Sequence, residues 1–456
     1  MILHNLQRWL DRNKGRIRTA VSMAWPSVLE SFFVALAGMV DTMMVSSIGA
    51  YAVAAVGLTT QPKFIGLALF IATNVSVSAI VARRRGEQDE RGANETLLTA
   101  LVFTALAGTV VSGICLYFAD PIIRLCGSGP DTHEGAVLYF RIIMGGMMFN
   151  ILSLVINAAQ RGSGNTRIAM TTNVTSNLLN IVGNYLLIGG HFGFPALGIE
   201  GAAIATVFGT VVACVMSFGS LLRKDSFVSI KAMVRDRVHV SLKPVKAIAK
   251  LSSSVFLEQL LMRAGFMSTA VMAAKLGTEA FAAHQAGMNI LSISFSFGDG
   301  MQVAAVALIG SSLGEKRPKL ARLYGQICQR IGNVISLVVS AVFLLGGRFL
   351  YSLYFDEPHI VDMGVVLVRV IVLIVIVQIA QVIYMGCLRG AGDVIFTTIA
   401  STISVTIIRT AVSYVMCYVL GFGLVGIWMG ILADQVSRFL FTSWRFKSGA
   451  WTKIHI

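Results

Sequence analysis

Several acidic side chains lie inside stretches of the sequence that are otherwise apolar. Asp41 lies in the segment GMVDTMMV, and Glu30 and Glu258 each lie within a long apolar run. An ionised side chain is costly to place in hydrocarbon, so acids in such positions tend to have a function. These carboxylates are therefore candidates for binding a proton or a cation inside a membrane.

Four asparagines fall on one side of a single predicted helix. Asn173, Asn177, Asn180 and Asn184 are spaced so that all four lie on the same helical face. Amides cannot face lipid without leaving donors unsatisfied, so this face must contact protein or a wet cavity. We expect Asn177, Asn180 and Asn184 to form a coupling site with Asp41. The alternative is ordinary hydrogen bonding between helices.

A second group of polar residues could line a substrate cavity. Its members are Glu258, Gln61, Asn289, Asp299, Gln378 and Tyr384. For Glu258 the alternative is a structural ion pair with Arg263, and for Asp299 a close helix contact that the flanking glycines admit. Pro26 removes a helical hydrogen bond and should bend its helix, which makes it a candidate hinge.

The composition indicates which elements carry these residues. Of the 456 residues, 55% are hydrophobic and 13% are charged, whereas soluble domains have roughly 25% charged residues. Runs of roughly twenty apolar residues fit a bilayer. We expect an all-α integral membrane protein with about twelve transmembrane helices. The expected spans are 19–46, 53–82, 95–118, 136–159, 168–189, 198–221, 246–274, 281–310, 324–351, 363–387, 395–420 and 426–446.

Basic residues concentrate in alternate connections between these spans. One side of the membrane holds clusters such as Arg83–Arg85 and the stretch from Arg223 to Lys250, while the other holds little beyond Arg124, Lys275 and Arg348. Lys and Arg mark the cytoplasmic side. Both termini are therefore expected in the cytoplasm of a multi-pass protein of the plasma (inner) membrane. The net charge of +15 is scattered, so no nucleic-acid partner is expected.

The sequence repeats at half its length. A gapless shift by half of the chain aligns loop glycines and charges, among them Gly86-Glu87 with Gly314-Glu315 and Arg161-Gly162 with Arg389-Gly390. We expect two parallel six-helix lobes, 1–222 and 244–456, joined by a cytoplasmic loop at 223–243. A pseudo-two-fold axis along the membrane normal would relate them and place a substrate cavity between them.

Motifs of other protein classes are missing from the sequence. It has no GxxxxGK[ST], HExxH or GxSxG, and its six cysteines stand singly. We therefore expect a monomeric transporter rather than an enzyme, with no cofactor and with the lipid bilayer as a partner. Transport would draw on an ion gradient or run downhill.

The whole chain resembles the multidrug and toxic compound extrusion (MATE) exporters. The resemblance rests on WPSVLESFFVALAGMVDTMMVSSIGAYAVAAVGL, ARRRGEQDERGANE and QRGSGNT, and on the second-half segments LEQLLMRAGFM, KLGTEAFAAHQAGMNI, ALIGSSLGEKRPKLAR and LRGAGD. It implies two six-helix lobes around a central cavity and exchange of external H⁺ or Na⁺, as the coupling ion, for cytoplasmic drugs. The implied partners are small organic, often cationic, substrates.

The resemblance also implies roles for particular residues. Asp41 matches the amino-lobe carboxylate of the family, Asn180 a polar neighbour, and Glu258 the carboxy-lobe acid of the NorM-like subgroup. Two departures weaken the cation sites, because Gln378 and Asn184 stand where relatives carry aspartates. Asp41 is therefore expected to be the main coupling residue.

The coupling ion expected at Asp41 is the proton. Burial disfavours the charged carboxylate and amide donors favour it, so a balanced carboxylate can take up and release a proton. Sodium, held by Asp41 and Asn180, is the second choice. The alternative function is flipping of a lipid-linked oligosaccharide, favoured by Arg141, Arg263, Arg369 and Arg409. A scaffold without transport would have no use for buried carboxylates.

Overall fold

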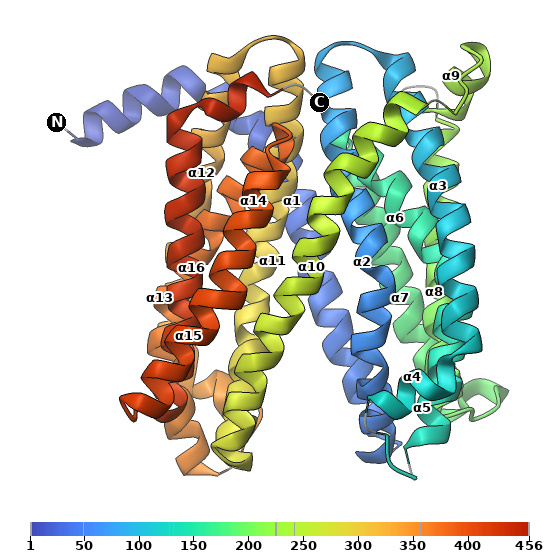
Figure 1. Ribbon diagram of the computed structural model, residues 1–456, viewed down its shortest axis with the longest axis vertical. Helices are drawn as coiled ribbons and strands as arrows, with labels where there is room; N and C mark the ends of the chain where they lie inside the picture. Colours follow the sequence, from blue (N-terminus) through green and yellow to red (C-terminus); the bar gives the residue numbers. More distant parts are fainter. Residues whose placement is uncertain are drawn as a thin grey trace. The chain divides into compact units, whose positions relative to one another are not determined.

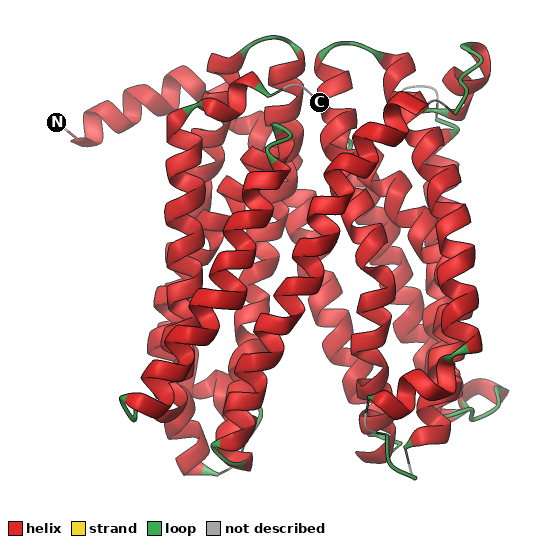
Figure 2. Ribbon diagram, in the orientation of Figure 1, coloured by secondary structure: helices red, strands yellow, loops and turns green. Residues whose placement is uncertain are grey.

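The computed structural model is built of helices joined by short connections (Figure 2). No strand occurs in the residues that it describes. Those residues are 2–48, 50–126, 128–130, 132–223, 226–240, 242–355 and 357–454.

The chain divides into two compact units. The amino-terminal unit is Phe32–Ser253, and the carboxy-terminal unit combines Met1–Ser31 with Ser254–Ile456. The boundaries differ from the expected lobes because two long helices contribute to both units. The first part of α1 (Ile2–Ser46) packs in the carboxy-terminal unit, and the first part of α10 (Leu242–Lys275) packs in the amino-terminal unit.

The amino-terminal unit consists of the last part of α1 and the elements that follow it (Figure 1). These are α2 (Ala50–Gly86), α3 (Glu90–Tyr117), α4 (Ala119–Leu125), α5 (His133–Gly145), α6 (Met147–Gly162), α7 (Thr166–Gly189), η1 (His191–Gly193), α8 (Ile199–Leu221), α9 (Ile230–Arg235) and the first part of α10. The short α4 lies at one end of this unit, and α9 lies at the other.

The carboxy-terminal unit has a matching series of helices. They are α10, α11 (Thr278–Gly314), α12 (Pro318–Ser352), α13 (Pro358–Gly390), α14 (Val394–Thr402), α15 (Arg409–Tyr414) and α16 (Gly423–Ser448). Two π-helical segments, η2 (Ile403–Ile408) and η3 (Val415–Val419), continue α14 and α15 as one rod, and the short helix η4 (Ala450–Lys453) follows α16. A core around Trp428, Ile374 and Ile379 holds this unit together.

The helices reproduce the expected membrane spans. Among the described residues, nine helices are long and apolar enough to cross a membrane, or ten if α5 and α6, which meet at 46°, form one span. The helices α7 and α10 are long enough, with 24 and 34 residues, but more polar. With these two the number of spans is the twelve expected from the sequence.

Corresponding turns in the two halves have the same backbone geometry. Gly164 follows α6 with φ of 82°, and Gly392 follows α13 with φ of 86°. These two glycines are separated by half the chain length, as are Gln88 and Lys316, which have φ of 57° and 58°. A positive φ is easily adopted by glycine and rarely by other residues. The repeat seen in the sequence therefore extends to the local structure.

A close helix contact also recurs in each unit. A Cβ placed on Gly162 of α6 would lie 2.5 Å from the backbone oxygen of Ser78 in α2. A Cβ on Gly390 of α13 would lie 2.6 Å from the backbone oxygen of Val306 in α11. Ser78 and Val306 are likewise separated by half the chain length, so each unit uses one glycine to bring the same two helices together.

The connecting loop is docked on the amino-terminal unit rather than extended. The backbone N–H of Ser229 donates to the side chain of Asn94 in α3 over 2.9 Å, and the Asn94 amide donates to the carbonyl of Phe227 over 3.3 Å. Ser229 then caps α9 by accepting from the N–H of Ala232. These bonds fix the loop against α3.

Candidate functional site

Asp41 is the acidic residue of a polar centre in the amino-terminal unit. It lies on α1 and accepts a hydrogen bond from the side-chain amide of Asn184 on α7. Asn180, one turn earlier on α7, accepts from the hydroxyl of Thr206 on α8 over 3.3 Å. We call Asp41, Tyr139, Asn180, Asn184 and Thr206 the amino-terminal centre.

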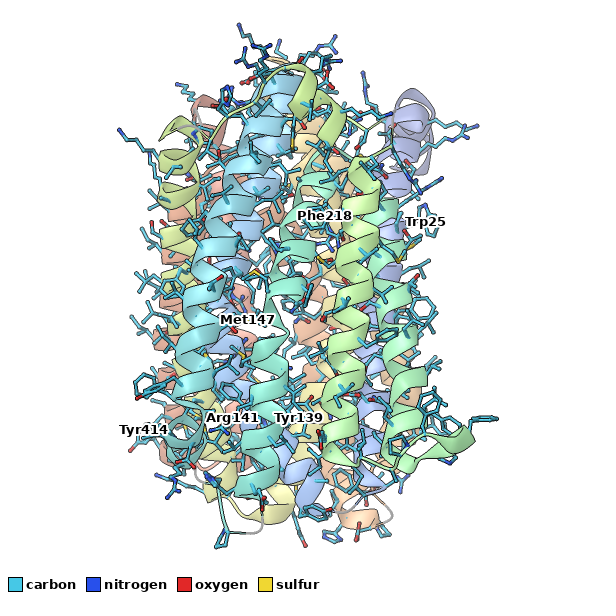
Figure 3. The ribbon with its side chains drawn as sticks, turned by 90° about the vertical axis from the view of Figure 1, so that its right-hand side faces the viewer. Trp25, Tyr139, Arg141, Met147, Phe218 and Tyr414 are labelled. Carbon is cyan, nitrogen blue, oxygen red and sulfur yellow. The ribbon has the colours of Figure 1, made fainter. Side chains whose placement is uncertain are left out.

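Tyr139 joins this centre from α5. Its hydroxyl shares a hydrogen bond with Thr206, and it is close enough to Asp41 for the carboxylate charge to act on it. Figure 3 shows Tyr139 beside Arg141 on α5, toward the end of the unit opposite Phe218. The side chain of Tyr139 is buried, so three helices, α5, α7 and α8, contribute polar groups to the centre that contains the α1 carboxylate.

The asparagine face predicted from spacing divides into two parts. Asn180 and Asn184 face other helices, whereas the Asn177 amide donates to the carbonyl of Asn173 on its own helix over 2.8 Å. The direct partner of Asp41 is Asn184, while Asn180 bonds to Thr206. Spacing alone identified the correct face but could not say which amide reaches the carboxylate.

Asn184 also presents an unused oxygen. Its side chain is completely buried, and while its nitrogen donates to Asp41, its oxygen Oδ1 has no hydrogen-bond partner in the described part of the chain. A buried acceptor without a donor is costly. The amino-terminal centre therefore contains one oxygen that is available to an incoming donor or cation.

Lys63 is a charged residue of this region that the sequence analysis missed. It lies on α2, within a predicted membrane span, and its ammonium is close enough to Asp41 for the two charges to attract each other. Ionisable residues inside spans tend to mark functional positions. This rule would have identified Lys63 if it had been applied to basic side chains as well as to acidic ones.

Glu258 is held in an ion pair. Its two carboxylate oxygens both accept from Nη2 of Arg389 at 2.8 Å, and Thr398 donates to Oε2 over 3.4 Å. Only 1% of the Glu258 side chain and 11% of the Arg389 side chain are exposed. Glu258 thus forms a structural ion pair, the kind of contact that the alternative named, with Arg389 as the cation. The cation comes from the LRG segment at the end of α13.

A second buried charge cluster lies in the carboxy-terminal unit. Asp434 on α16 accepts from Nε and Nη2 of Arg438 at 2.8 and 3.0 Å, and Nε of Arg409 lies 3.8 Å from the same carboxylate. The Arg409 guanidinium also stacks over Phe266 at 4.7 Å. Sequence reasoning had noted Arg409 but not the carboxylate that neutralises it.

The other predicted cavity residues are spread over the carboxy-terminal unit. Gln378 is buried and accepts from Ser294 over 2.9 Å, and the Tyr384 ring packs against Phe439 and Phe446. Asn289 is exposed and Asp299 is half-buried. Gln378 and Tyr384 thus contact different helices, α11 and α16 respectively.

Two further predictions concern the first two helices. Pro26 is buried inside α1, which continues as a helix on both sides of it. The backbone of Gln61 belongs to α2, but its side chain lies outside the described residues.

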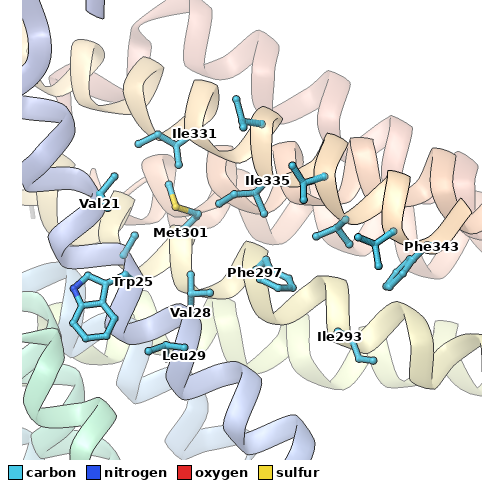
Figure 4. Close-up of a pocket in the computed structure, with 15 residues that line it drawn as sticks. Val21, Trp25, Val28, Leu29, Ile293, Phe297, Met301, Ile331, Ile335 and Phe343 are labelled. Atoms are coloured by element: carbon cyan, nitrogen blue, oxygen red, sulfur yellow. The ribbon is translucent and has the colours of Figure 1, made fainter. Parts of the chain in front are cut away.

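Two of the cavities in the described part of the chain open on the carboxy-terminal unit. One of about 660 Å³ is lined entirely by apolar and aromatic residues of α1, α11 and α12, including Trp25, Phe297 and Phe343 (Figure 4). The other, of about 920 Å³, lies between α10 and the rod of α14 and α15, where Ser268 and Thr410 add hydroxyl groups. In the described part of the chain, no group of three or more His, Cys, Asp or Glu residues could hold a metal ion.

The MatE family model matches residues 26–186 and again residues 255–415, which together exceed half of the chain. The chain belongs to the MatE family. The starts of the two matches are separated by almost exactly the repeat offset found in the sequence, half of the chain. Each half of the chain thus matches the same family model once, as a duplication predicts.

Individual relatives agree over nearly the full length. The chain is 27% identical over 440 residues to a probable multidrug resistance protein NorM of Thermotoga maritima, which covers 95% of this chain and 92% of that protein. It is 26% identical over 436 residues to the multidrug resistance protein PmpM of Pseudomonas aeruginosa, with coverages of 92% and 89%.

A solved structure shares the fold. It is an outward-facing conformation of a multidrug resistance MATE family transporter, with a TM-score of 0.88 at 24% identity, covering 95% of this chain and 96% of that one. The expected fold class, an all-α membrane protein with two six-helix lobes, is confirmed.

Proposed function

We propose that this MatE protein exports small organic compounds, often cationic, in exchange for protons. The observation that carries the proposal is Asp41, a carboxylate inside a membrane span that is bonded to the completely buried Asn184. An acid in this setting is costly unless it serves to bind a proton or a cation.

The exchange follows from two states of Asp41. The ionised carboxylate accepts the Asn184 amide, while the protonated form becomes a donor and changes which groups it bonds. A difference of a few kcal/mol between the two arrangements is enough to change the dominant conformation. Proton entry from outside can thus drive the step that releases substrate.

The substrate class is supported by the cavities and by the relatives. A volume of about 660 Å³ lined by aromatic and aliphatic side chains fits a drug-sized molecule. Aromatic faces such as that of Trp25 also attract organic cations. NorM and PmpM relatives are named multidrug resistance proteins, which agrees with broad specificity.

The proposed setting is the inner membrane, with both termini in the cytoplasm and the protein acting as a monomer. The orientation rests on basic residues such as Arg83–Arg85 and those of the docked loop, which includes Arg235 and Arg237. Positive charge marks cytoplasmic segments. Export is then movement of the substrate from the cytoplasmic side, where these basic residues lie, to the outside.

The test is efflux of a fluorescent organic cation from proteoliposomes under an imposed pH gradient without sodium. We expect wild-type protein to drive efflux and Asp41→Asn to fall to the rate of protein-free liposomes, because asparagine carries no exchangeable proton. Wild-type efflux that requires sodium would contradict proton coupling. An active Asp41→Asn would remove Asp41 from the mechanism.

A matched control is Asp120→Asn in the same unit. Asp120 lies on α4 outside the predicted spans, and hydrogen bonds from His133 and Arg124 lower its pKa. Its carboxylate is 44% exposed, and exposed ion pairs contribute little to stability. We expect this variant to keep wild-type efflux, which would show that loss of a carboxylate as such does not stop transport.

A further inference from the structure

Lys63 is an unusual residue for its position. It lies within the span Ala55–Gly86, where an ammonium group is as costly as a carboxylate. Its side chain is only partly exposed, and the one ring contact that it makes among the described residues, at 5.7 Å, is to the adjacent Phe64. The amino-terminal centre therefore has a basic group of its own.

The groups around Lys63 explain why it is tolerated. Its charge and that of Asp41 attract each other, although within the described residues the two do not form a direct ion pair. Asn184 holds the carboxylate through its nitrogen and leaves Oδ1 buried without a donor in the described part of the chain. The Lys63 ammonium therefore balances the carboxylate charge across a gap, without a hydrogen bond, and leaves the Asn184 oxygen without a donor.

The same oxygens would otherwise suit a sodium ion. Hard cations prefer carboxylate and carbonyl oxygens, and the centre contains the Asp41 carboxylate, the unused Asn184 oxygen and the Asn180 oxygen. With Asp41 ionised and Lys63 protonated, the net charge of the centre is zero. A sodium ion would add an uncompensated positive charge beside the ammonium.

We propose that Lys63 is a built-in counter-cation of Asp41 that excludes sodium from the amino-terminal centre. The proton is not excluded in the same way, because it forms a covalent O–H bond with the carboxylate and needs no shell of oxygen ligands. Sodium depends on electrostatic attraction alone, which a neighbouring like charge removes. This proposal deepens the proposed function, since it names the residue that sets the ion specificity of that centre.

The test is equilibrium binding of radioactive sodium to purified protein in detergent, without a gradient or substrate. We expect wild type to show no Asp41-dependent binding up to the highest sodium concentration used. Lys63→Gln should bind sodium with a Kd roughly tenfold or more below that concentration, a difference of the size typical of coupled sites. Lys63→Gln combined with Asp41→Asn should lose this binding. Lys63→Arg, which keeps the charge, should exclude sodium like wild type.

Two results would overturn the proposal. One is saturable sodium binding by wild type that disappears in Asp41→Asn. The other is absence of sodium binding in both Lys63→Gln and Lys63→Met when these variants elute as monodisperse protein. The wild-type measurement can overturn the proposal by itself, whether or not the variants fold. Because binding is measured without transport, failure of proton-driven efflux would not affect this result, and each hypothesis can fail separately.

Discussion

Replacing Glu258 by glutamine should lower stability more than it lowers coupling. The carboxylate is 1% exposed and accepts twice from Arg389 at 2.8 Å, and Arg389 itself is 11% exposed. Glutamine is close in size but uncharged, so Arg389 would remain buried without a counter-charge. Removing one partner of a buried ion pair costs about 3–5 kcal/mol.

The lower end of this range applies here. The glutamine oxygen can still accept one hydrogen bond, and Arg389 keeps some contact with solvent. A loss of about 3 kcal/mol corresponds to a fall of roughly 6–12 °C in melting temperature for a unit of this size. The assay is thermal unfolding of purified protein in detergent, followed by efflux measured per folded molecule.

The double variant supplies the control. Glu258→Met combined with Arg389→Met removes both charges and should recover much of the stability, because apolar pairs often replace buried ion pairs at little cost. Glu258→Gln should retain proton-driven efflux at a reduced rate. A Glu258→Gln protein with wild-type melting temperature and no efflux would refute this reasoning and make Glu258 a coupling residue.

Two further predictions concern packing and orientation. Gly162→Ala and Gly390→Ala should each lower the free energy of unfolding by about 1–3 kcal/mol, since the new methyl would lie 2.5 or 2.6 Å from a backbone oxygen. The control is Gly113→Ala, where the new methyl would meet open space. This variant should leave the free energy of unfolding unchanged or raise it slightly in the same assay. A cysteine in place of Val234, 73% exposed in α9, should resist an impermeant maleimide in intact cells and react after permeabilisation, in a cysteine-free background. Ser229, which is 6% exposed, is a poor labelling site, and rapid labelling at 234 from outside would reverse the proposed orientation.

The spans could be predicted from sequence because hydropathy and the bilayer thickness together determine them. Helix ends were less accurate, since α1 begins at Ile2 and α10 at Leu242, beyond the apolar cores that indicated them. Polar helices extend past the hydrocarbon as long as their hydrogen bonds continue. No hydropathy pattern records that extension.

Partners of individual side chains were harder to predict than the residues themselves. Glu258 was singled out correctly as buried, but Arg263, close by in the same helix, could not be separated from Arg389, which lies on a distant part of the chain. Helical spacing identified the asparagine face of α7 but not that Asn184 reaches Asp41. Contacts of this kind depend on how helices pack, which periodicity within one helix does not contain.

The glycine contact shared by the two units has a consequence for how they diverged. Gly162 and Gly390 meet backbone oxygens, so the spacing of the helices is kept even though the partner residue is Ser78 in one unit and Val306 in the other. Side chains elsewhere were free to change. At the positions equivalent to Asp41 and Asn184, the second copy carries Thr269 and Val412. After an ancestral duplication, one copy could thus keep side chains for ion binding while the other lost them. Both copies kept the same helix packing.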